Sequence, residues 1–249
     1  MYAILRFQKK TSGKLLNTQK HNERQKTEYK SNPDIDQTRT AENYHLKNPT
    51  PDGYKKEISR LIERAGCRTR KDSIVAVETL ITASPEFLNG LDKDDQREFF
   101  TLAYDFLKEE VGEQNILSAI VHMDEKTPHM HLCFCPITKD NHLSAKTILG
   151  NQKTLSEWQT KFHAHMSRHY TELERGKSAM ETKRKHIPVW LFKQSARLDE
   201  MYGKVVSLLN DTSWIGKKER QKEAIDLLAE FIPKADYFAA EVKKTEAYA

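Results

Sequence analysis

The sequence predicts an α/β sandwich in which a mainly antiparallel sheet carries helices on it and a helical extension follows toward the C-terminus. Three observations predict this fold class. Some segments alternate apolar and polar residues or are rich in Val, Ile and Thr, as strands are. Other segments repeat apolar residues every three or four positions, as helices do. The two kinds neither alternate strictly nor separate fully, and only helical patterns follow Leu155.

Five segments have the composition of strands, and two of them are close enough in sequence to form a hairpin. A short polar turn separates the last two segments, so we expect those two strands to pair antiparallel. The segments are Tyr2–Gln8, Asn43–Leu46, Ile74–Thr82, Ile116–Met123 and His129–Pro136.

The N-terminal two thirds of the chain also contain three helical patterns between the strands. The third is the clearest, because Asp92 is a good N-cap, apolar residues recur at helical spacing, and Gly112 stands where a helix ends. The patterns are a polar helix within Thr11–Tyr29 that carries His21 and Arg24, a helix from Tyr54 to about Ala65, and the helix that Asp92 caps.

The C-terminal third contains helical patterns alone, and the expected breaks between its helices come from proline. We expect two further helical pieces at 219–232 and 236–244, separated by Pro233, because proline interrupts a helix. The expected buried faces are Leu155, Trp158, Phe162, Met166, Tyr170 and Leu173 on one helix, and Leu191, Leu198, Met201, Val205 and Leu208 on the next.

Composition excludes several classes of protein. Of the 249 residues, 37% are hydrophobic and 31% are charged, with a mean hydropathy of −0.77, so no apolar run is long enough to span a bilayer. The nine glycines form neither GxG nor GxxxxGK, which argues against dinucleotide and nucleotide sites. Cys67, Cys133 and Cys135 make no disulfide pattern, and no export signal opens the chain, so we expect a reducing cytoplasm.

The net charge of +5 is unevenly distributed along the chain. Residues 73–140 hold 5 Lys and Arg against 13 Asp and Glu, whereas both ends of the chain are basic. Basic segments attract nucleic-acid phosphates through counterion release, although an ordinary solvated surface explains them equally well at a pI of 8.9. The candidate phosphate contacts are Lys9 and Lys10, Arg68, Arg70 and Lys71, and Lys183–Lys185.

The segment from His122 to His131 carries the most chemical information. On a strand, His129 and His131 point to one face, while Met130, Leu132 and Phe134 point to the opposite, apolar face. In a hairpin, His122 lies beside them across the turn, and three imidazoles with open remaining positions make a catalytic metal site. Imidazole favours Mn, Fe, Co, Ni, Cu or Zn over Mg.

Two alternatives compete with this metal site. A lone His-x-His is more often the polar face of a half-buried strand, and it is the third histidine and nearby Glu125 that reverse this preference. Cys133 and Cys135 continue the same face, but ligands drawn from a single strand lie about 7 Å apart and cannot surround one ion. We therefore favour the three-histidine site.

The motif His122-x-Asp-Glu-x-x-Pro-His129-Met-His131 resembles the plasmid mobilisation relaxases of the Pre/Mob (MobV) type, which belong to the HUH endonucleases. The upstream segments Lys20–Arg24 and Asn43–Leu46, and Leu173–Lys177 further on, also resemble that family in order and spacing. The resemblance implies a five-stranded antiparallel HUH sheet flanked by helices. It also implies an enzyme that nicks one strand at a plasmid origin of transfer. On this basis we expect a catalytic domain at 1–200 and a helical extension at 201–249.

The resemblance also assigns roles to individual residues. His122, His129 and His131 match the ligands of a divalent metal, with Mn²⁺ favoured over Mg²⁺. His21 matches the nucleophile, Glu125 the carboxylate that orients it, and Arg24 the neighbouring basic residue. Many other HUH enzymes use tyrosine, so Tyr29 and Tyr44 are rival nucleophiles. Candidate DNA contacts are Arg24, Arg68, Arg70, Lys71 and Arg175.

These roles imply a covalent 5′-phosphohistidine and a bacterial cytoplasmic enzyme that acts on origin-of-transfer DNA. Two alternatives remain: a DNA-binding replication, recombination or partition protein that breaks no bond, and a zinc hydrolase that forms no protein–DNA intermediate. Members of the family are often longer, so the chain is expected to be a fragment or a short member, with a homodimer contact in the C-terminal region.

Overall fold

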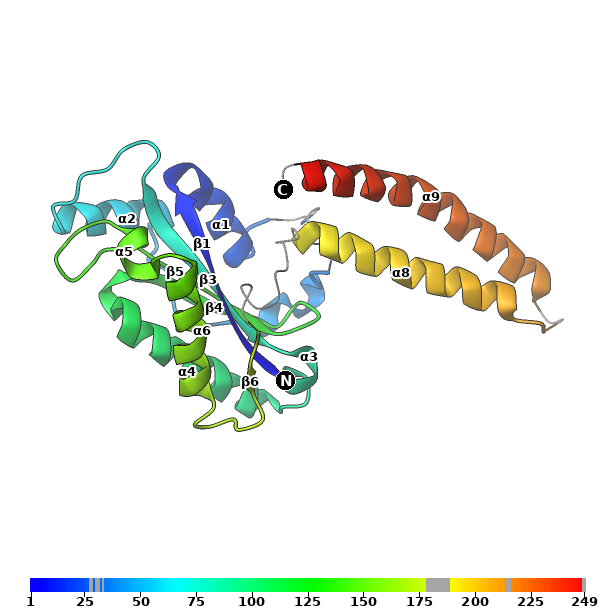
Figure 1. Ribbon diagram of the computed structural model, residues 1–249, viewed down its shortest axis with the longest axis horizontal. Coiled ribbons are helices and arrows are strands. Elements are labelled where there is room, and N and C mark those ends of the chain that lie inside the picture. The colour runs from blue at the N-terminus through cyan, green and yellow to red at the C-terminus, as the bar shows by residue number, and fades with distance from the viewer. Residues whose placement is uncertain (27–28, 30–31, 33, 178–188, 214–215, 248–249) are drawn as a thin grey trace. The chain divides into compact units, whose positions relative to one another are not determined.

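The computed structural model describes residues 1–26, 29, 32, 34–177, 189–213 and 216–247 (Figure 1). The chain forms two compact units, Met1–Thr182 and Lys183–Ala249. The first unit contains every strand that is described, and the second is a pair of helices. The predicted boundary at residue 200 lies within the first helix of the second unit, and the extent of the catalytic domain stays a prediction.

One sheet of six strands organises the first unit, in the order β2-β4-β5-β3-β1-β6. Five strands are antiparallel to their neighbours, as expected, but a two-residue sixth strand adds a parallel edge next to β1. The strands are β1 (Tyr2–Thr11), β2 (Tyr44–Lys47), β3 (Ile74–Ala83), β4 (Ile116–His122), β5 (His129–Phe134) and β6 (Glu174–Arg175).

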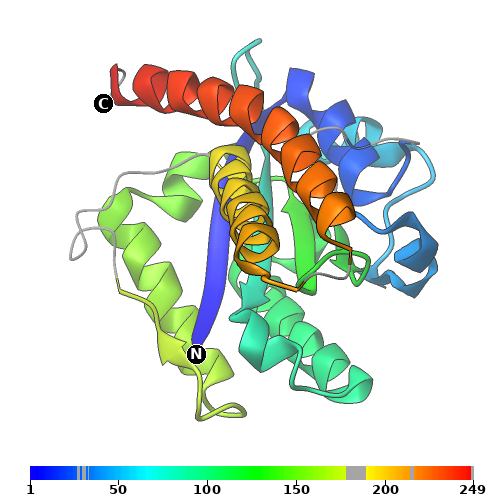
Figure 2. The same cartoon turned by 90° about the vertical axis from the view of Figure 1, so that its right-hand side faces the viewer.

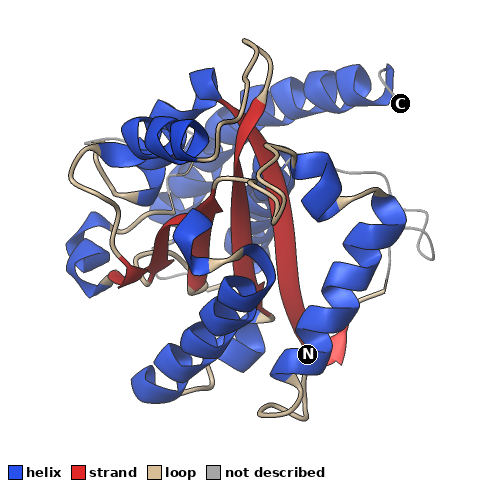
Figure 3. Cartoon of the chain, turned by 90° about the vertical axis from the view of Figure 1, so that its left-hand side faces the viewer, coloured by secondary structure: helices blue, strands red, loops and turns tan. Residues whose placement is uncertain are grey.

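Helices cover one face of the sheet and enclose the larger apolar core (Figure 3). Phe99 and Phe106 of α4 and Trp158 and Phe162 of α6 pack against this face, together with Met130 of β5. Helix α4 begins as predicted, because the Asp92 carboxylate accepts hydrogen bonds from the amides of Asp94 and Asp95. The helices of this side are α3 (Pro85–Leu88), α4 (Lys93–Val111), α5 (Ala145–Leu149) and α6 (Gln152–Met166).

A second apolar cluster lies on the opposite face of the sheet, beneath α1 (Leu15–Asn22) and α2 (Gly53–Arg64). Figure 2 shows the molecule from the side on which α1 lies. Leu15, Tyr54 and Ile58 pack here against Cys133 of β5 and against Cys135, which follows that strand. All three cysteines of the chain are free thiols. The alternation predicted for β5 is therefore confirmed, since its histidines and Cys133 share the face opposite Met130 and its apolar partners.

Three details of the helices differ from expectation. Helix α1 ends at Asn22, so Arg24 lies just beyond it, with a left-handed φ of 48°. Helix α6 ends at Met166, and Tyr170 and Leu173 reach the core from the segment that follows rather than from the same helix. Leu155, at the start of that predicted face, is 39% exposed.

The second unit is a hairpin of α8 (Val189–Asn210) and α9 (Lys217–Ala247). The break predicted at Pro233 is wrong, because α9 continues through it and curves along its length (Figure 1). Proline removes one hydrogen bond and crowds the preceding turn, which a curved helix accommodates without ending. The side chain of Leu191 and the segment Lys183–Lys185 lie outside the described residues. No described helix has the length and apolar character needed to cross a membrane.

Candidate active site

The hairpin of β4 and β5 brings the three expected histidines together. His122 ends β4 and pairs directly with His129 at the start of β5, while His131 follows two residues later on the same face. The ring centroids of His122, His129 and His131 lie 4.9 to 5.2 Å from one another. Local sequence was sufficient to predict this cluster, because a short turn fixes the pairing of the two strands.

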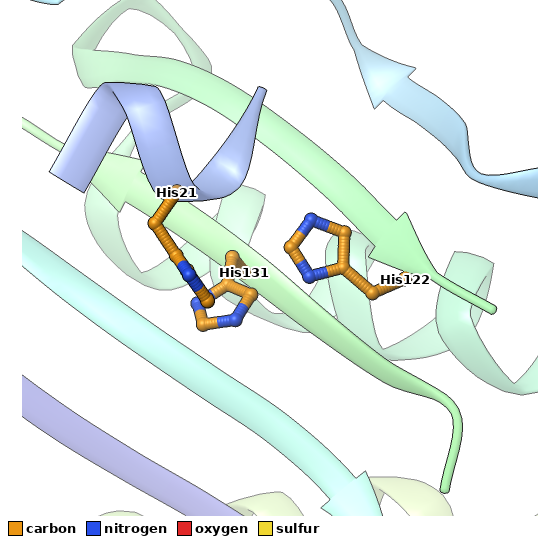
Figure 4. Close-up of side chains that lie close together, drawn as sticks. All are labelled: His21, His122 and His131. Carbon is orange, nitrogen blue, oxygen red and sulfur yellow. The ribbon is translucent and has the colours of Figure 1, made fainter. Parts of the chain in front are cut away.

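His21 reaches this cluster from a distant part of the sequence. It lies on α1, and its ring centroid is 5.7 Å from that of His122 and 5.2 Å from that of His131. In Figure 4 its ring points toward the two rings that project from the sheet. A fourth imidazole therefore stands over the histidine cluster.

Backbone carbonyls fix the orientation of two rings in the cluster. His122 Nε2 lies 2.8 Å from the Asn22 carbonyl, and His129 Nδ1 lies 2.9 Å from that of Thr127. A carbonyl only accepts hydrogen bonds, so these two nitrogens carry the protons. The lone pairs are consequently on His122 Nδ1 and His129 Nε2, the form in which imidazole binds a metal.

The arrangement fits a divalent cation. His122 Nδ1 is buried and has no hydrogen-bond partner among the described residues, which is costly unless a ligand occupies that position. One ligand atom from each of His21, His122 and His131 lies within 4.8 Å of the other two. The same holds for His122, Glu125 and His129, so His122 belongs to both sets.

Burial keeps the rings of His21, His122 and His129 neutral near pH 7. Desolvation, followed by the charge of His131, lowers the pKa of His21 and that of His129, each to about 4. The same two causes, in that order, lower the pKa of His122 well below its ordinary value. Neutral imidazoles offer the lone pairs that both metal binding and nucleophilic attack need.

Arg24 forms a buried clamp between two carboxylates. Its Nε and a terminal nitrogen donate to Asp124 at 2.8 and 2.7 Å, and the same terminal nitrogen donates to Glu125 at 2.9 Å. The Arg24 side chain is only 5% exposed, so its guanidinium serves the interior of the site. Asn32 donates to the second Glu125 oxygen, whose partner oxygen lies 3.6 Å from His129 Nε2.

Glu78 is a residue of this site that the sequence interpretation missed. One oxygen pairs with Lys10 at 2.7 Å, and the other lies 3.2 Å from His131 Nδ1, at an angle outside hydrogen-bond geometry. Burial raises its pKa, but contacts with His131 and Lys10 outweigh burial and lower the pKa to about 2. The available signal was a single charged residue inside the apolar strand Ile74–Thr82. Lys10, expected as a phosphate contact, is instead buried in this pair.

The two rival tyrosines differ in position. The ring centroid of Tyr29 is 6.0 Å from that of His21, and its hydroxyl donates to the Lys20 carbonyl. Tyr44 packs against the core on the far face of the sheet, with the Arg97 guanidinium 4.4 Å from its ring centroid. Burial raises the pKa of Tyr44 to about 12, which disfavours it as a nucleophile.

The remaining candidate DNA contacts lie away from the cluster in sequence and differ in exposure. Arg68, Arg70 and Lys71 are exposed in the loop between α2 and β3. Arg175 is half-buried, and its guanidinium donates to Ser156 and Thr160 of α6. Contact of these side chains with DNA stays a prediction.

The fold and the histidine cluster define a domain of the HUH relaxase type. The family model described as plasmid recombination enzyme (Mob_Pre) matches residues 1–194, and the chain belongs to this family. A plasmid recombination enzyme type 3 of Mammaliicoccus lentus is 40% identical over 197 residues, which are 78% of this chain and 48% of the relative. A plasmid recombination enzyme of Bacillus thuringiensis is 37% identical over 80% of this chain and 44% of its own length.

Solved structures of the MobM relaxase domain (MOBV; Mob_Pre) have the same fold. One of them is a manganese-bound complex of that domain with 22 nucleotides of plasmid pMV158 oriT DNA that carry a 3′-thiophosphate. Its TM-score to the present chain is 0.72 and its sequence identity is 35%, and the match covers 78% of this chain and 99% of that one. A complex with 26 nucleotides of the same oriT DNA has a TM-score of 0.62 and 32% identity, covering 76% and 98%. The present chain spans about half the length of the curated relatives it matches.

Proposed function

We propose that the chain is the catalytic part of a plasmid relaxase, a metal-dependent endonuclease and strand transferase that nicks one strand of an origin of transfer. The observation that carries the proposal is the position of His21, whose ring from α1 faces the histidines of the β4–β5 hairpin. In a DNA-binding protein that breaks no bond, nothing requires a neutral, half-buried imidazole at this point. The manganese-bound, oriT-bound MobM domain supports the same assignment of class.

His122, His129 and His131 would hold the divalent cation, with Mn²⁺ favoured by the related structures and Mg²⁺ as the alternative. When bound, the cation neutralises phosphate charge and orients the phosphorus for attack. Glu78, in contact with the ring of His131, would support that ring.

His21 is the nucleophile in this proposal. A ring nitrogen with its lone pair attacks the phosphorus, the N–P bond forms, and the bond from phosphorus to the 3′-oxygen breaks. The 3′-oxygen leaves and takes up a proton, and the 5′-phosphate stays on His21. The N–P bond between His21 and the DNA is not hydrolysed. A 3′-hydroxyl can therefore attack the same phosphorus in the reverse reaction and rejoin a strand.

Glu125 is the orienting carboxylate in this proposal. Its charge raises the pKa of His21, although burial and His131 outweigh that effect. As the ring becomes cationic during attack, a nearby carboxylate stabilises it. Arg24 and Asn32 hold Glu125 in place, and Arg24 stays a candidate for a DNA contact as well.

The wider assignments extend this proposal. Plasmid oriT DNA is the substrate, reached near the nick as a single strand or hairpin, with Arg68, Arg70, Lys71 and Arg175 as candidate contacts. Nicking would start conjugative mobilisation in the bacterial cytoplasm. A homodimer through the C-terminal region is part of the same expectation.

A denaturing adduct assay tests the proposal. Supercoiled plasmid carrying the candidate origin is incubated with protein and Mn²⁺, then denatured and examined for DNA attached to protein. We expect an adduct with the natural chain and its loss in His21→Ala, with DNA binding retained, because only the attacking nitrogen is removed. Tyr29→Phe is the matched control and should keep the adduct.

The other outcomes contradict the proposal in distinct ways. Adduct formation by His21→Ala together with its loss in Tyr29→Phe would move the nucleophile to tyrosine. Nicking without any adduct would indicate a metal-dependent hydrolase, and binding without nicking would indicate a DNA-binding protein.

A further inference from the structure

His21 also takes part in a second set of possible ligands, which it forms with two of the three hairpin histidines, His122 and His131. One ring nitrogen each from His21, His122 and His131 lies within 4.8 Å of the other two (Figure 4). A zinc–nitrogen bond is about 2.0–2.1 Å, so nitrogens on one ion lie at most roughly 4.2 Å apart. Small side-chain rotations therefore bring all three into bonding range.

The donors of this set are ready to bind. His122 Nδ1 is buried without a hydrogen-bond partner among the described residues, and the Asn22 carbonyl fixes the proton on the other nitrogen. Asn22 follows His21 directly on α1. The same helical turn therefore carries the ligand His21 and, through the Asn22 carbonyl, orients the ligand His122. The site is thus built from α1 and the hairpin together.

The two overlapping sets differ in chemistry. His21, His122 and His131 offer imidazole alone. His122 and His129, which would hold the cation of the proposed function together with His131, also lie within 4.8 Å of a carboxylate oxygen of Glu125. Imidazole suits Zn²⁺, Ni²⁺ and Cu²⁺, while carboxylate and water suit Mn²⁺ and Mg²⁺. Because His122 belongs to both sets, one ion occupies only one set at a time.

We propose that His21, His122 and His131 form an inhibitory site for Zn²⁺ in the DNA-free protein, with the nucleophile itself as a ligand. The inference rests on the proposed function, because it gives the attacking residue a second role. A neutral imidazole has one lone pair, and a lone pair bound to Zn²⁺ cannot attack phosphorus. Zn²⁺ would then hold the enzyme inactive until it is removed.

Separate calorimetric titrations of the DNA-free full chain with ZnCl₂ and with MnCl₂ test this site. Loss of a residue that only hydrogen-bonds to a metal ligand weakens metal affinity by about tenfold or more, and loss of a ligand itself weakens it at least as much. His21→Ala should therefore weaken Zn²⁺ binding about tenfold or more. Mn²⁺ binding by His21→Ala should stay within about twofold. His129→Ala should show the opposite pattern.

His142→Ala is the control for surface binding, since His142 is exposed and pairs with Asp140 outside the site. It should change neither affinity. Retained Mn²⁺ binding shows that His21→Ala is folded. Equal Zn²⁺ affinity in the natural chain and in His21→Ala would overturn the inference. An equal loss of affinity for Zn²⁺ and Mn²⁺ in His21→Ala would overturn it too, as would a natural chain that does not bind Zn²⁺.

The adduct assay separates this inference from the proposed function. If His21→Ala still forms the DNA adduct, the assignment of the nucleophile fails, while the Zn²⁺ titration still decides the metal site. If His21→Ala loses the adduct but binds Zn²⁺ as tightly as the natural chain, the inhibitory site is wrong and the relaxase proposal stands.

Discussion

Glu78 shows how one buried charge on a neighbouring strand can organise a site. Its side chain and that of Lys10 are each 11% exposed, and the pair sits against His131. Removing one partner of a buried ion pair leaves the other charge without compensation. Glu78 therefore contributes both to the position of His131 and to the free energy of unfolding.

We expect Glu78→Gln to lower the free energy of unfolding by about 3 kcal/mol at pH 7, because Lys10 then stays buried without its partner. The folded pKa of Glu78 is about 2, below its ordinary value of 4.5. A lowered pKa stabilises the fold above the unfolded value, and this contribution disappears as pH falls from 4.5 toward about 2. Urea unfolding of both proteins at pH 7 and pH 3 measures the difference.

Glu109→Gln is the matched control, since Glu109 is exposed on α4, and it should change the free energy of unfolding little. A difference between the natural chain and Glu78→Gln that is as large at pH 3 as at pH 7 would show that the charge of Glu78 is not the cause.

Helix α4 illustrates the element scale, because its ends were predictable and its packing defines one face of the sheet. Asp92 Oδ1 accepts from the Asp94 and Asp95 amides at 2.9 and 2.8 Å, and Gly112 follows the last turn with a φ of 82°. Phe99, Phe100 and Leu107 of this helix are fully buried. The sheet face opposite the histidines is therefore covered by a helix with well-defined ends.

Asp92→Ala should reduce the free energy of unfolding by about 1 kcal/mol, because it leaves two amides of the first turn without an acceptor. Asp92→Asn keeps an acceptor oxygen and should lose much less. Chemical denaturation of the three proteins under identical conditions measures this. Equal losses in both variants would mean that the charge of Asp92, not its capping hydrogen bonds, stabilises α4.

At the scale of the whole molecule, the first unit contains both apolar clusters and all of the candidate site. The buried residues of the two clusters lie between Ala3 and Leu173. His21, the hairpin histidines and Glu78 lie within the same span. Met1–Thr182 thus has its own core, as an independently folding domain requires.

A chain that ends at residue 182 should therefore fold and unfold in one cooperative transition, with a midpoint within about 5 °C of the corresponding transition in the full chain. Its Mn²⁺ affinity should match that of the full chain within about twofold. Scanning calorimetry and metal titration measure both properties. A broad transition, or loss of Mn²⁺ binding, would show that the second unit is needed to complete the first.

Local patterns allowed accurate prediction of the hairpin, α2 and α4, where strand alternation, caps and turn residues act within a few positions. Local patterns were insufficient where a residue's conformation or partners depend on parts of the chain that lie far from it in sequence. Pro233 predicts a break, yet α9 continues, because a helix can lose one hydrogen bond and curve. The partners of Arg24 were not predictable either, because Asp124 and Glu125 lie about one hundred residues away in the sequence; its contact with DNA stays a prediction.

The order of residues alone determined that three imidazoles share one face of a hairpin, since alternation along a strand and a short turn leave no other arrangement. The tertiary structure decided what surrounds them. It placed α1 over the sheet so that His21 faces the hairpin, turned Arg24 inward, and set Glu78 beside His131, with Lys10 next to Glu78. These contacts join segments far apart in the chain, and only the packing of the complete sheet brings such segments together.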